Sequence, residues 1–272
     1  MKKEILHFAH ANGFPGGSYN KLLSHFREQY KVIAIDRLGH NHEFPVNNNW
    51  TNLADELIAF LEKEAGSPVI GAGHSLGSLV TFIAAYKRPD LFRAVIMLDP
   101  PFVTGIWGLV FRFLKFTGAA DRITPAGQSS GRRSVWSDIR EAETYFLSKK
   151  LFRQFDPASL SDYMKYGTES CDNGLCLSYD VPTEVKIFQT MPDNIGSYNR
   201  PLGIPGALIY GDTSHAVHLP TLKKFTALHG FNLCTSPGGH LFPLEKPDDA
   251  AAVMKRELEN IFAVTSADRA AS

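Results

Sequence analysis

The residues best suited to chemistry lie in the pentapeptide GHSLG at positions 73–77, directly after the apolar run 68–72. A serine hydroxyl is a poor nucleophile unless a base lies within reach, and a sharp strand-to-helix turn exposes its Oγ where a base can approach. Glycines on both sides allow such a turn and let the following helix pack closely on the strand. We therefore interpret Ser75 as a candidate nucleophile.

A base for this serine lies near the other end of the chain. His240 ends the glycine-rich segment 236–240, after the last expected strand and before the closing helix, and it alone among the ten histidines has that position. An imidazole there could take the proton from Ser75 Oγ during attack on a carbonyl carbon. His240 is therefore the candidate base.

A carboxylate must orient the base, and the sequence offers two. Asp99 follows the strand expected at 94–98, and Asp212 follows the strand expected at 206–210. The carboxyl ends of parallel strands meet at one edge of a sheet, which is where ligands bind in such folds. Both carboxylates are expected at that edge, so the residues alone leave the choice open.

The elements that would position these side chains follow from the hydrophobic pattern. Apolar runs of strand length alternate with segments of helical period, which is typical of an α/β fold with a mostly parallel, doubly wound sheet. About six strands are expected, at 4–9, 31–35, 68–72, 94–98, 206–210 and 232–235. Helices are expected at 18–29, 52–64, 76–87, 220–228 and 247–262.

Between Pro100 and Pro205 this alternation stops for about a hundred residues. That is too long for a structureless loop in a compact domain, so we predict an inserted helical cap at 103–202. The core then comprises residues 1–102 and 203–264. Residues 265–272 are expected to form a disordered tail.

The predicted cap is rich in aromatic residues, of which Trp107, Phe111 and Trp136 are candidates for binding an apolar substrate. The same residues could instead form the core of the cap itself. The apolar helix expected at 106–116 could pack across the mouth of the active site. Because Arg112 and Lys115 flank its aromatic residues, it could alternatively contact a membrane surface.

Composition narrows the function classes. The chain has 28 basic and 28 acidic residues and no basic block, which argues against binding nucleic acid or an anionic membrane as the main task. The three cysteines, Cys171, Cys176 and Cys234, cannot all pair, so a reduced, cytoplasmic setting with incidental thiols is expected. We find no phosphate-binding loop, no dinucleotide motif and no zinc-spaced cysteine set, and we predict neither a cofactor nor a metal.

Four segments in this order resemble the α/β-hydrolase superfamily: NGFPGG at 12–17, DRLGH at 36–40, the Ser75 turn, and GH at 239–240. The resemblance covers nearly everything outside 100–205. It implies Ser75 as nucleophile, His240 as base, and an oxyanion hole formed by the backbone N–H groups of Phe14 and Leu76. The family's usual N-terminal hairpin is missing, and Asn12 stands where a histidine usually precedes the glycine.

The resemblance also bears on the acid. The family usually places it three residues beyond the glycine that ends the penultimate strand, and that position holds Ser214. A small esterase subgroup with the same Gly-x-x-Ser ending uses the earlier aspartate, which favours Asp99 over Asp212 here.

A serine at the turn, rather than an aspartate, implies acyl chemistry. The resemblance therefore implies a serine carboxylesterase or thioesterase that acts on a small-molecule ester or thioester through an acyl-enzyme. Two alternatives stay open, because one scaffold hosts many functions. One is a lyase or C–C bond hydrolase with the same triad, and the other is a non-catalytic ligand-binding relative.

Overall fold

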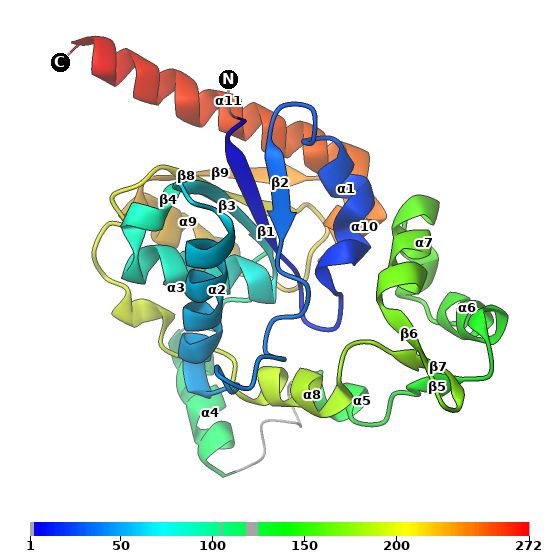
Figure 1. Cartoon of the computed structure of the whole chain (residues 1–272). Coiled ribbons are helices and arrows are strands. Elements are labelled where there is room, and N and C mark those ends of the chain that lie inside the picture. Colours follow the sequence, from blue (N-terminus) through cyan, green and yellow to red (C-terminus); the bar gives the residue numbers. More distant parts are fainter. Residues whose placement is uncertain (1–2, 104, 118–124, 272) are drawn as a thin grey trace.

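The computed structural model describes residues 3–103, 105–117 and 125–271 of the chain (Figure 1). Its centre is a six-stranded parallel sheet with the strand order β2-β1-β3-β4-β8-β9. The strands are β1 (Ile5–Ala9), β2 (Lys31–Ala34), β3 (Val69–His74), β4 (Phe92–Leu98), β8 (Gly206–Gly211) and β9 (Phe231–Ser236). The predicted fold class, a doubly wound parallel sheet of about six strands, is confirmed.

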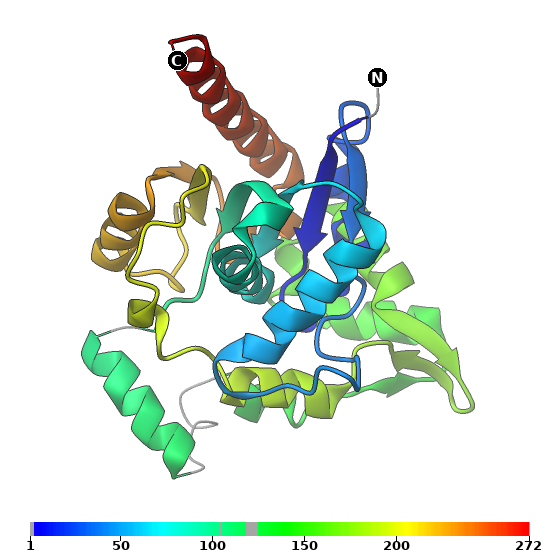
Figure 2. The ribbon, with the colours of Figure 1, turned by 60° about the vertical axis from the view of Figure 1, so that its left-hand side comes forward.

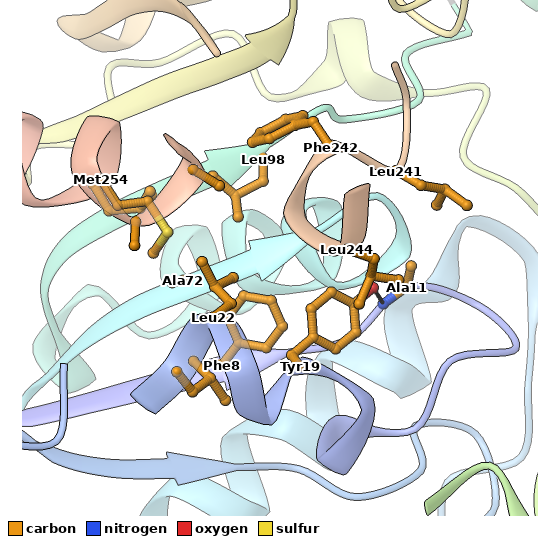
Figure 3. Packing of buried hydrophobic residues seen from close by; sticks show 14 of the residues in the cluster. Phe8, Ala11, Tyr19, Leu22, Ala72, Leu98, Leu241, Phe242, Leu244 and Met254 are labelled. Atoms are coloured by element: carbon orange, nitrogen blue, oxygen red, sulfur yellow. Dashed lines mark hydrogen bonds between the residues drawn. The ribbon is translucent and has the colours of Figure 1, made fainter. Parts of the chain in front are cut away.

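Helices cover both faces of this sheet, as the alternation of side chains along its strands requires. On β1, Leu6 and Phe8 pack on one face with α1 (Asn20–Ser24) and α11 (Pro247–Ala271), and part of this core is drawn in Figure 3. Ile5 and Ala9 pack on the other face. The helices on that face are α2 (Thr51–Glu64), α3 (Leu76–Lys87) and α9 (Leu219–His229).

Short helical turns join these elements: η1 (Gly16–Tyr19), η2 (Asn48–Trp50), η3 (Pro89–Leu91) and α10 (Phe242–Glu245). The helix expected at 18–29 is thus shorter than predicted and is split between η1 and α1.

The cap lies between β4 and β8 and is not wholly helical. Its helices are α4 (Gly105–Phe116), α5 (Ala126–Ser129), α6 (Ile139–Ser148), η5 (Phe152–Gln154), α7 (Pro157–Tyr166), α8 (Val181–Gln189) and η6 (Ile195–Ser197). It also contains an antiparallel sheet of order β5-β7-β6, from β5 (Val135–Trp136), β6 (Thr168–Cys171) and β7 (Gly174–Leu177). The predicted cap is mainly helical, and the sequence did not indicate its small sheet, because strands of two to four residues are too short to show an alternating pattern.

The cysteine prediction also needs correction. Cys171 and Cys176 form a disulfide across the β6–β7 hairpin, while Cys234 of β9 is free and half-buried. Asp172 and Asn173 form the turn of this hairpin, and Gly174, the first residue of β7, has a φ of 116°. An Asn-Gly pair in the sequence is a strong hairpin signal.

At the C-terminus, α11 continues to Ala271, into the segment expected as a tail over 265–272. The segment 263–271 is rich in alanine and contains neither glycine nor proline, so nothing in it stops a helix. Figures 1 and 2 show this end of α11 extending away from the sheet.

Helix α4 projects from the core at the opposite end of the molecule (Figure 2). It exposes Leu109 and Phe113, while Phe111 is buried, and Arg112 and Lys115 both form ion pairs with Asp193. Within the described residues, no helix is both long enough and apolar enough to cross a membrane.

The core buries a titratable side chain on β1, that of His7. His7 of β1 is fully buried beside Phe60, and neither of its ring nitrogens has a hydrogen-bond partner among the described residues. Burial, and to a smaller degree the neighbouring His10, lowers the pKa of His7 from 6.5 to about 3. The imidazole is therefore neutral in the folded protein at neutral pH.

This pKa makes stability depend on pH. The unfolded chain protonates His7 near pH 6.5 and the folded chain only near pH 3, so the stability due to the neutral imidazole is complete above pH 6.5 and is lost as the pH falls. Between pH 7 and pH 5, His7 should lower the unfolding free energy of wild type by roughly 2 kcal/mol. H7L lacks this contribution, so its unfolding free energy should fall by that much less. Urea denaturation at both pH values measures it. An H42L control in an exposed loop should leave the loss unchanged, and equal losses in wild type and H7L would contradict the assignment.

Candidate active site

The loop between β3 and α3 places Ser75 in a conformation that few residues adopt. Its φ is 51° and its ψ is −112°, and its backbone N–H donates to the carbonyl of Leu98 at 2.9 Å. A Cβ added to Gly73 would lie 2.3 Å from the carbonyl oxygen of Gly77, and one added to Gly77 would lie 2.1 Å from that of Ala9. Both glycines are therefore required by close backbone approach.

Three side chains far apart in the sequence meet at this turn. His240 Nε2 lies 3.0 Å from Ser75 Oγ, and His240 Nδ1 lies 2.7 Å from Asp99 Oδ2. Because a carboxylate can only accept, Nδ1–H must donate to Asp99, which leaves Nε2 free to accept the serine O–H. The order serine, imidazole, carboxylate is the arrangement that activates a hydroxyl for nucleophilic attack.

Asp99 is fully buried just beyond the end of β4 and is held by two further donors. The backbone N–H of Gly211 donates to its Oδ1 at 2.8 Å, and Ser214 Oγ donates to its Oδ2 at 2.7 Å. Ser214 thus occupies the position where the resemblance would place the acid, and it donates to Asp99 from the loop that follows β8. No local pattern in the sequence predicts this contact.

Asp212 has a different environment. Its side chain is exposed, and its Oδ1 accepts the backbone N–H of Gly238 at 2.9 Å. This bond joins the loop after β8 to the loop that carries His240. Among the described contacts, none joins the Asp212 carboxylate to the imidazole.

A second buried histidine supports the loop of His240. His74 Nε2 lies 2.8 Å from the backbone carbonyl oxygen of His240, and its Nδ1 lies 2.7 Å from Tyr19 Oη. Nε2–H therefore donates to the carbonyl and Nδ1 accepts from Tyr19, whose Oη in turn accepts the N–H of Ala11 at 3.2 Å. Burial and the nearby His240 lower the pKa of His74 well below its usual range, so it stays neutral.

This chain of hydrogen bonds links the loop after β1 to the loop after β9 through the turn at Ser75. Sequence reasoning missed it, although His74 belongs to the pentapeptide itself.

The two backbone groups expected to form an oxyanion hole differ in their present partners. Leu76 is the first residue of α3, so its N–H has no acceptor within the helix. The N–H of Phe14 donates to the carbonyl of Ala11 at 3.1 Å and closes a turn. The Phe14 ring packs on Tyr163 of the cap, with ring centroids 5.5 Å apart.

Two cavities meet at Ser75 and His240, which line both of them. One has a volume of about 1200 Å³ and lies between the core and the cap. The other has a volume of about 270 Å³ and is lined mainly by apolar residues. Among the described residues, no cluster of three His, Cys, Asp or Glu side chains forms a candidate metal site.

The three aromatic residues expected to bind substrate do not line these cavities where they can be placed. Trp136 is buried in the cap against Phe146, with ring centroids 5.0 Å apart, and Phe111 is buried on α4. The side chain of Trp107 lies outside the described residues. Trp50 and Phe188 line the small cavity instead.

The close approach at Gly77 can be tested by stability. We expect G77A to lower the unfolding free energy by about 1–3 kcal/mol, because the added methyl would overlap the Ala9 carbonyl and force the backbone apart. Chemical denaturation measures the change. In η6, a Cβ on Gly196 would meet nothing within 4 Å, so G196A is the matched control. Equal stabilities of the two variants would contradict the close contact.

The sequence and the fold of this chain are similar to those of known proteins. A curated relative, 2-(acetamidomethylene)succinate hydrolase of Mesorhizobium japonicum, is 21% identical over 227 residues, which cover 82% of this chain and 76% of the relative. Lipase LipV of Mycobacterium tuberculosis is 36% identical over 80 residues, or 29% of this chain and 30% of LipV. A probable esterase of Oryza sativa is 26% identical over 104 residues, or 36% of this chain and 38% of the esterase. For these last two, the chain spans less than two fifths of the relative.

Solved structures share the fold. The crystal structure of E-2-(acetamidomethylene)succinate hydrolase has a TM-score of 0.76 at 19% identity and covers 95% of this chain and 93% of its own. A thioesterase domain from the curacin biosynthetic pathway has a TM-score of 0.70 at 16% identity, with 92% and 90% covered. A sequence profile described as the Alpha/beta hydrolase family matches residues 8–253, which is most of the sequence. The chain therefore belongs to the alpha/beta hydrolase family.

Proposed function

We propose that this chain is a serine hydrolase that cleaves a carboxylic ester or thioester through an acyl-enzyme on Ser75. The observation that carries the proposal is the unbroken hydrogen-bond chain from Ser75 Oγ through His240 to Asp99, with lengths of 3.0 and 2.7 Å. In such a chain the hydroxyl can lose its proton to the imidazole at the moment it attacks a carbonyl carbon.

The reaction then follows from the positions of the same groups. As Oγ bonds to the carbonyl carbon, His240 Nε2 takes the serine proton and the carbonyl oxygen becomes negatively charged. Collapse of this tetrahedral species breaks the bond to the leaving group, which receives the proton from Nε2. A water molecule then gives one proton to His240 as it attacks the acyl carbon. Collapse of this second tetrahedral species breaks the bond to Oγ, releases the acid and returns the proton from Nε2 to Ser75.

Asp99 would stabilise the imidazolium that forms twice in this cycle. The bonds from Gly211 N–H and Ser214 Oγ keep its carboxylate in place while the charge on His240 changes. The developing oxyanion needs donors that are already oriented. The N–H of Leu76 meets this need, and the N–H of Phe14 could join it by sharing or exchanging its bond to Ala11.

The relatives support a hydrolytic reaction, since their names describe a lipase, an esterase and a hydrolase of a substituted succinate. A serine at the turn favours acyl transfer among the reactions this family hosts. No observation favours a lyase, a C–C bond hydrolase or a non-catalytic binding protein over this assignment.

Covalent labelling tests the nucleophile. We expect a fluorophosphonate probe to label folded wild-type protein on Ser75 and not to label S75A, because only an activated hydroxyl attacks the phosphorus. Mass spectrometry of the labelled peptide measures this. H42L, a change in an exposed loop, should label like wild type. An unlabelled, folded wild type would argue for a binding protein.

Paired aspartate variants test the acid. We expect D99N to lower kcat for 4-nitrophenyl butyrate by about 10³- to 10⁴-fold, because an amide in place of the carboxylate stabilises the wrong imidazole tautomer. D212N should lose little activity, because its carboxylate contacts only the Gly238 N–H. Steady-state kinetics of both variants, with circular dichroism to confirm folding, measures the difference. Small, equal losses would refute a triad built on either residue.

A further inference from the structure

The two cavities that meet at the reacting groups differ in chemistry. The small cavity, about 270 Å³, is below the range of roughly 300–1,000 Å³ typical of ligand pockets. Among the described residues that line it there is no Asp, Glu, Lys or Arg, and His240 is shared with the large cavity. Its walls are built from Trp50, Leu76, Phe102, Ile187 and Met191. Such a cavity suits a short apolar group.

The large cavity, about 1200 Å³, is lined by more cationic than acidic side chains. Its lysines are Lys149 and Lys150, which follow α6 in the cap, and Lys246, which follows α10 in the core. All three are exposed, so they place the mouth of the cavity at the surface. Cations from both parts of the molecule therefore face the same space.

The acidic side chains of this cavity are already engaged. Glu184 forms an ion pair with Arg132 at 2.6 Å and accepts Ser129 Oγ at 2.8 Å, while Glu245 accepts the N–H of Gly239 at 2.8 Å. Arg132 thus has its counter-charge within the cap. Against the effect of burial, Tyr163 and Glu184 raise the pKa of Arg132 above its ordinary value.

The lysines have no such counter-charge. Lys149 lies over the ring of Tyr145, with Nζ 4.4 Å from the centroid. Among the described residues, no ion pair is formed by Lys149, Lys150 or Lys246. Among the described lining residues, the three lysines outnumber Glu245, whose carboxylate is in no ion pair, so the cavity walls carry a net positive charge.

The order of the reaction decides which part of a substrate enters which cavity. The leaving group takes a proton from His240 and departs first, while the acyl group stays bound to Ser75. The large cavity is lined by the loop 238–241 around His240 and opens to solvent at the lysines, so it offers the exit route. The small apolar cavity can retain the acyl group until water attacks.

We propose that the substrate joins a short, uncharged, apolar acyl group to a bulky leaving group that carries a phosphate or a carboxylate. The small cavity holds the acyl group, and Lys149, Lys150 and Lys246 bind the anion of the leaving group. This inference rests on the proposed ester or thioester hydrolysis and adds the substrate class. It concerns specificity, so its failure leaves the hydrolytic reaction intact.

Four butyryl substrates and two sets of variants test it. Butyryl-coenzyme A carries phosphates on its leaving group, 4-(butyryloxy)benzoate carries a carboxylate there, and phenyl butyrate and 4-nitrophenyl butyrate are neutral. The double variant K150M/K246M removes two of the three lysines. K186M is the matched control, because Lys186 is exposed on α8 and lines neither cavity.

We expect K150M/K246M to lower kcat/KM for at least one anionic butyryl substrate by about tenfold at low salt, and to leave both neutral esters within about twofold of wild type. K186M should leave every rate within about twofold. The anionic substrate whose rate falls more identifies the source of the anion as phosphate or carboxylate. Raising the salt concentration should reduce the wild-type rate with that substrate towards the rate of the double variant.

The acyl side is tested separately. Mono(4-nitrophenyl) succinate carries its charge on the acyl group, and we expect wild type to hydrolyse it more slowly than 4-nitrophenyl butyrate. 4-Nitrophenyl laurate, with its long acyl chain, should also be slower. A faster, lysine-dependent reaction of the succinate ester would place the acyl group in the large cavity and overturn the proposal.

The outcomes separate this inference from the proposed function. If neutral esters are hydrolysed through Ser75 but the lysine variants change anionic and neutral substrates alike, the inference fails and the serine hydrolase stands. If no ester is hydrolysed and the fluorophosphonate probe does not label Ser75, the proposed function fails, and the inference fails with it.

Discussion

The geometry of the site depends on how one imidazole is held. His240 is bound at Nδ1 by Asp99, at Nε2 by Ser75, and at its own backbone carbonyl by His74. Ser75 directly follows β3 and Asp99 directly follows the neighbouring strand β4, while His74 is the last residue of β3. Ring and backbone are thus fixed to the rigid edge of a parallel sheet, which is the place where such folds gather polar groups around a ligand.

That edge also stores backbone strain. Ser75 has a φ of 51° and Asp99 a φ of 45°, and both directly follow paired strands, β3 and β4. Conformations of this kind are unfavourable by about 1–3 kcal/mol each for residues other than glycine. They persist because the sheet continues to hold the backbone, as Ser75 N–H donates to Leu98 and Asp99 N–H donates to Ile209. These backbone conformations direct the side chains of Ser75 and Asp99 out of the sheet and towards His240.

The sequence predicted the sheet and the Ser75–His240 pair because both depend on local patterns: apolar runs, glycines and chain order. The residues by themselves did not choose between Asp99 and Asp212, since both follow strands that end at the same edge, and only the family resemblance favoured Asp99. The difference lies in contacts across the sheet, where Ser214 binds Asp99 and Gly238 binds Asp212. For a similar reason the sequence left two roles open for Trp136, because composition does not distinguish the core of a cap from the wall of a cavity.

Besides the two segments of chain that connect them, the cap and the core are linked by a hydrogen bond close to the reacting groups. Asn12 Nδ2 donates to the backbone carbonyl of Glu184 on α8, so the loop after β1 is bound to the helix whose carboxylate pairs with Arg132. Asn12 also lines both cavities. In this chain an asparagine stands where the resemblance led us to expect a histidine. Its amide N–H₂ group can donate to a carbonyl, which a carboxylate or a methyl group cannot do. The same loop carries Phe14, whose N–H is proposed as a donor to the oxyanion. Through Asn12, the position of α8 is therefore coupled both to the walls of the two cavities and to the proposed oxyanion loop beside Ser75.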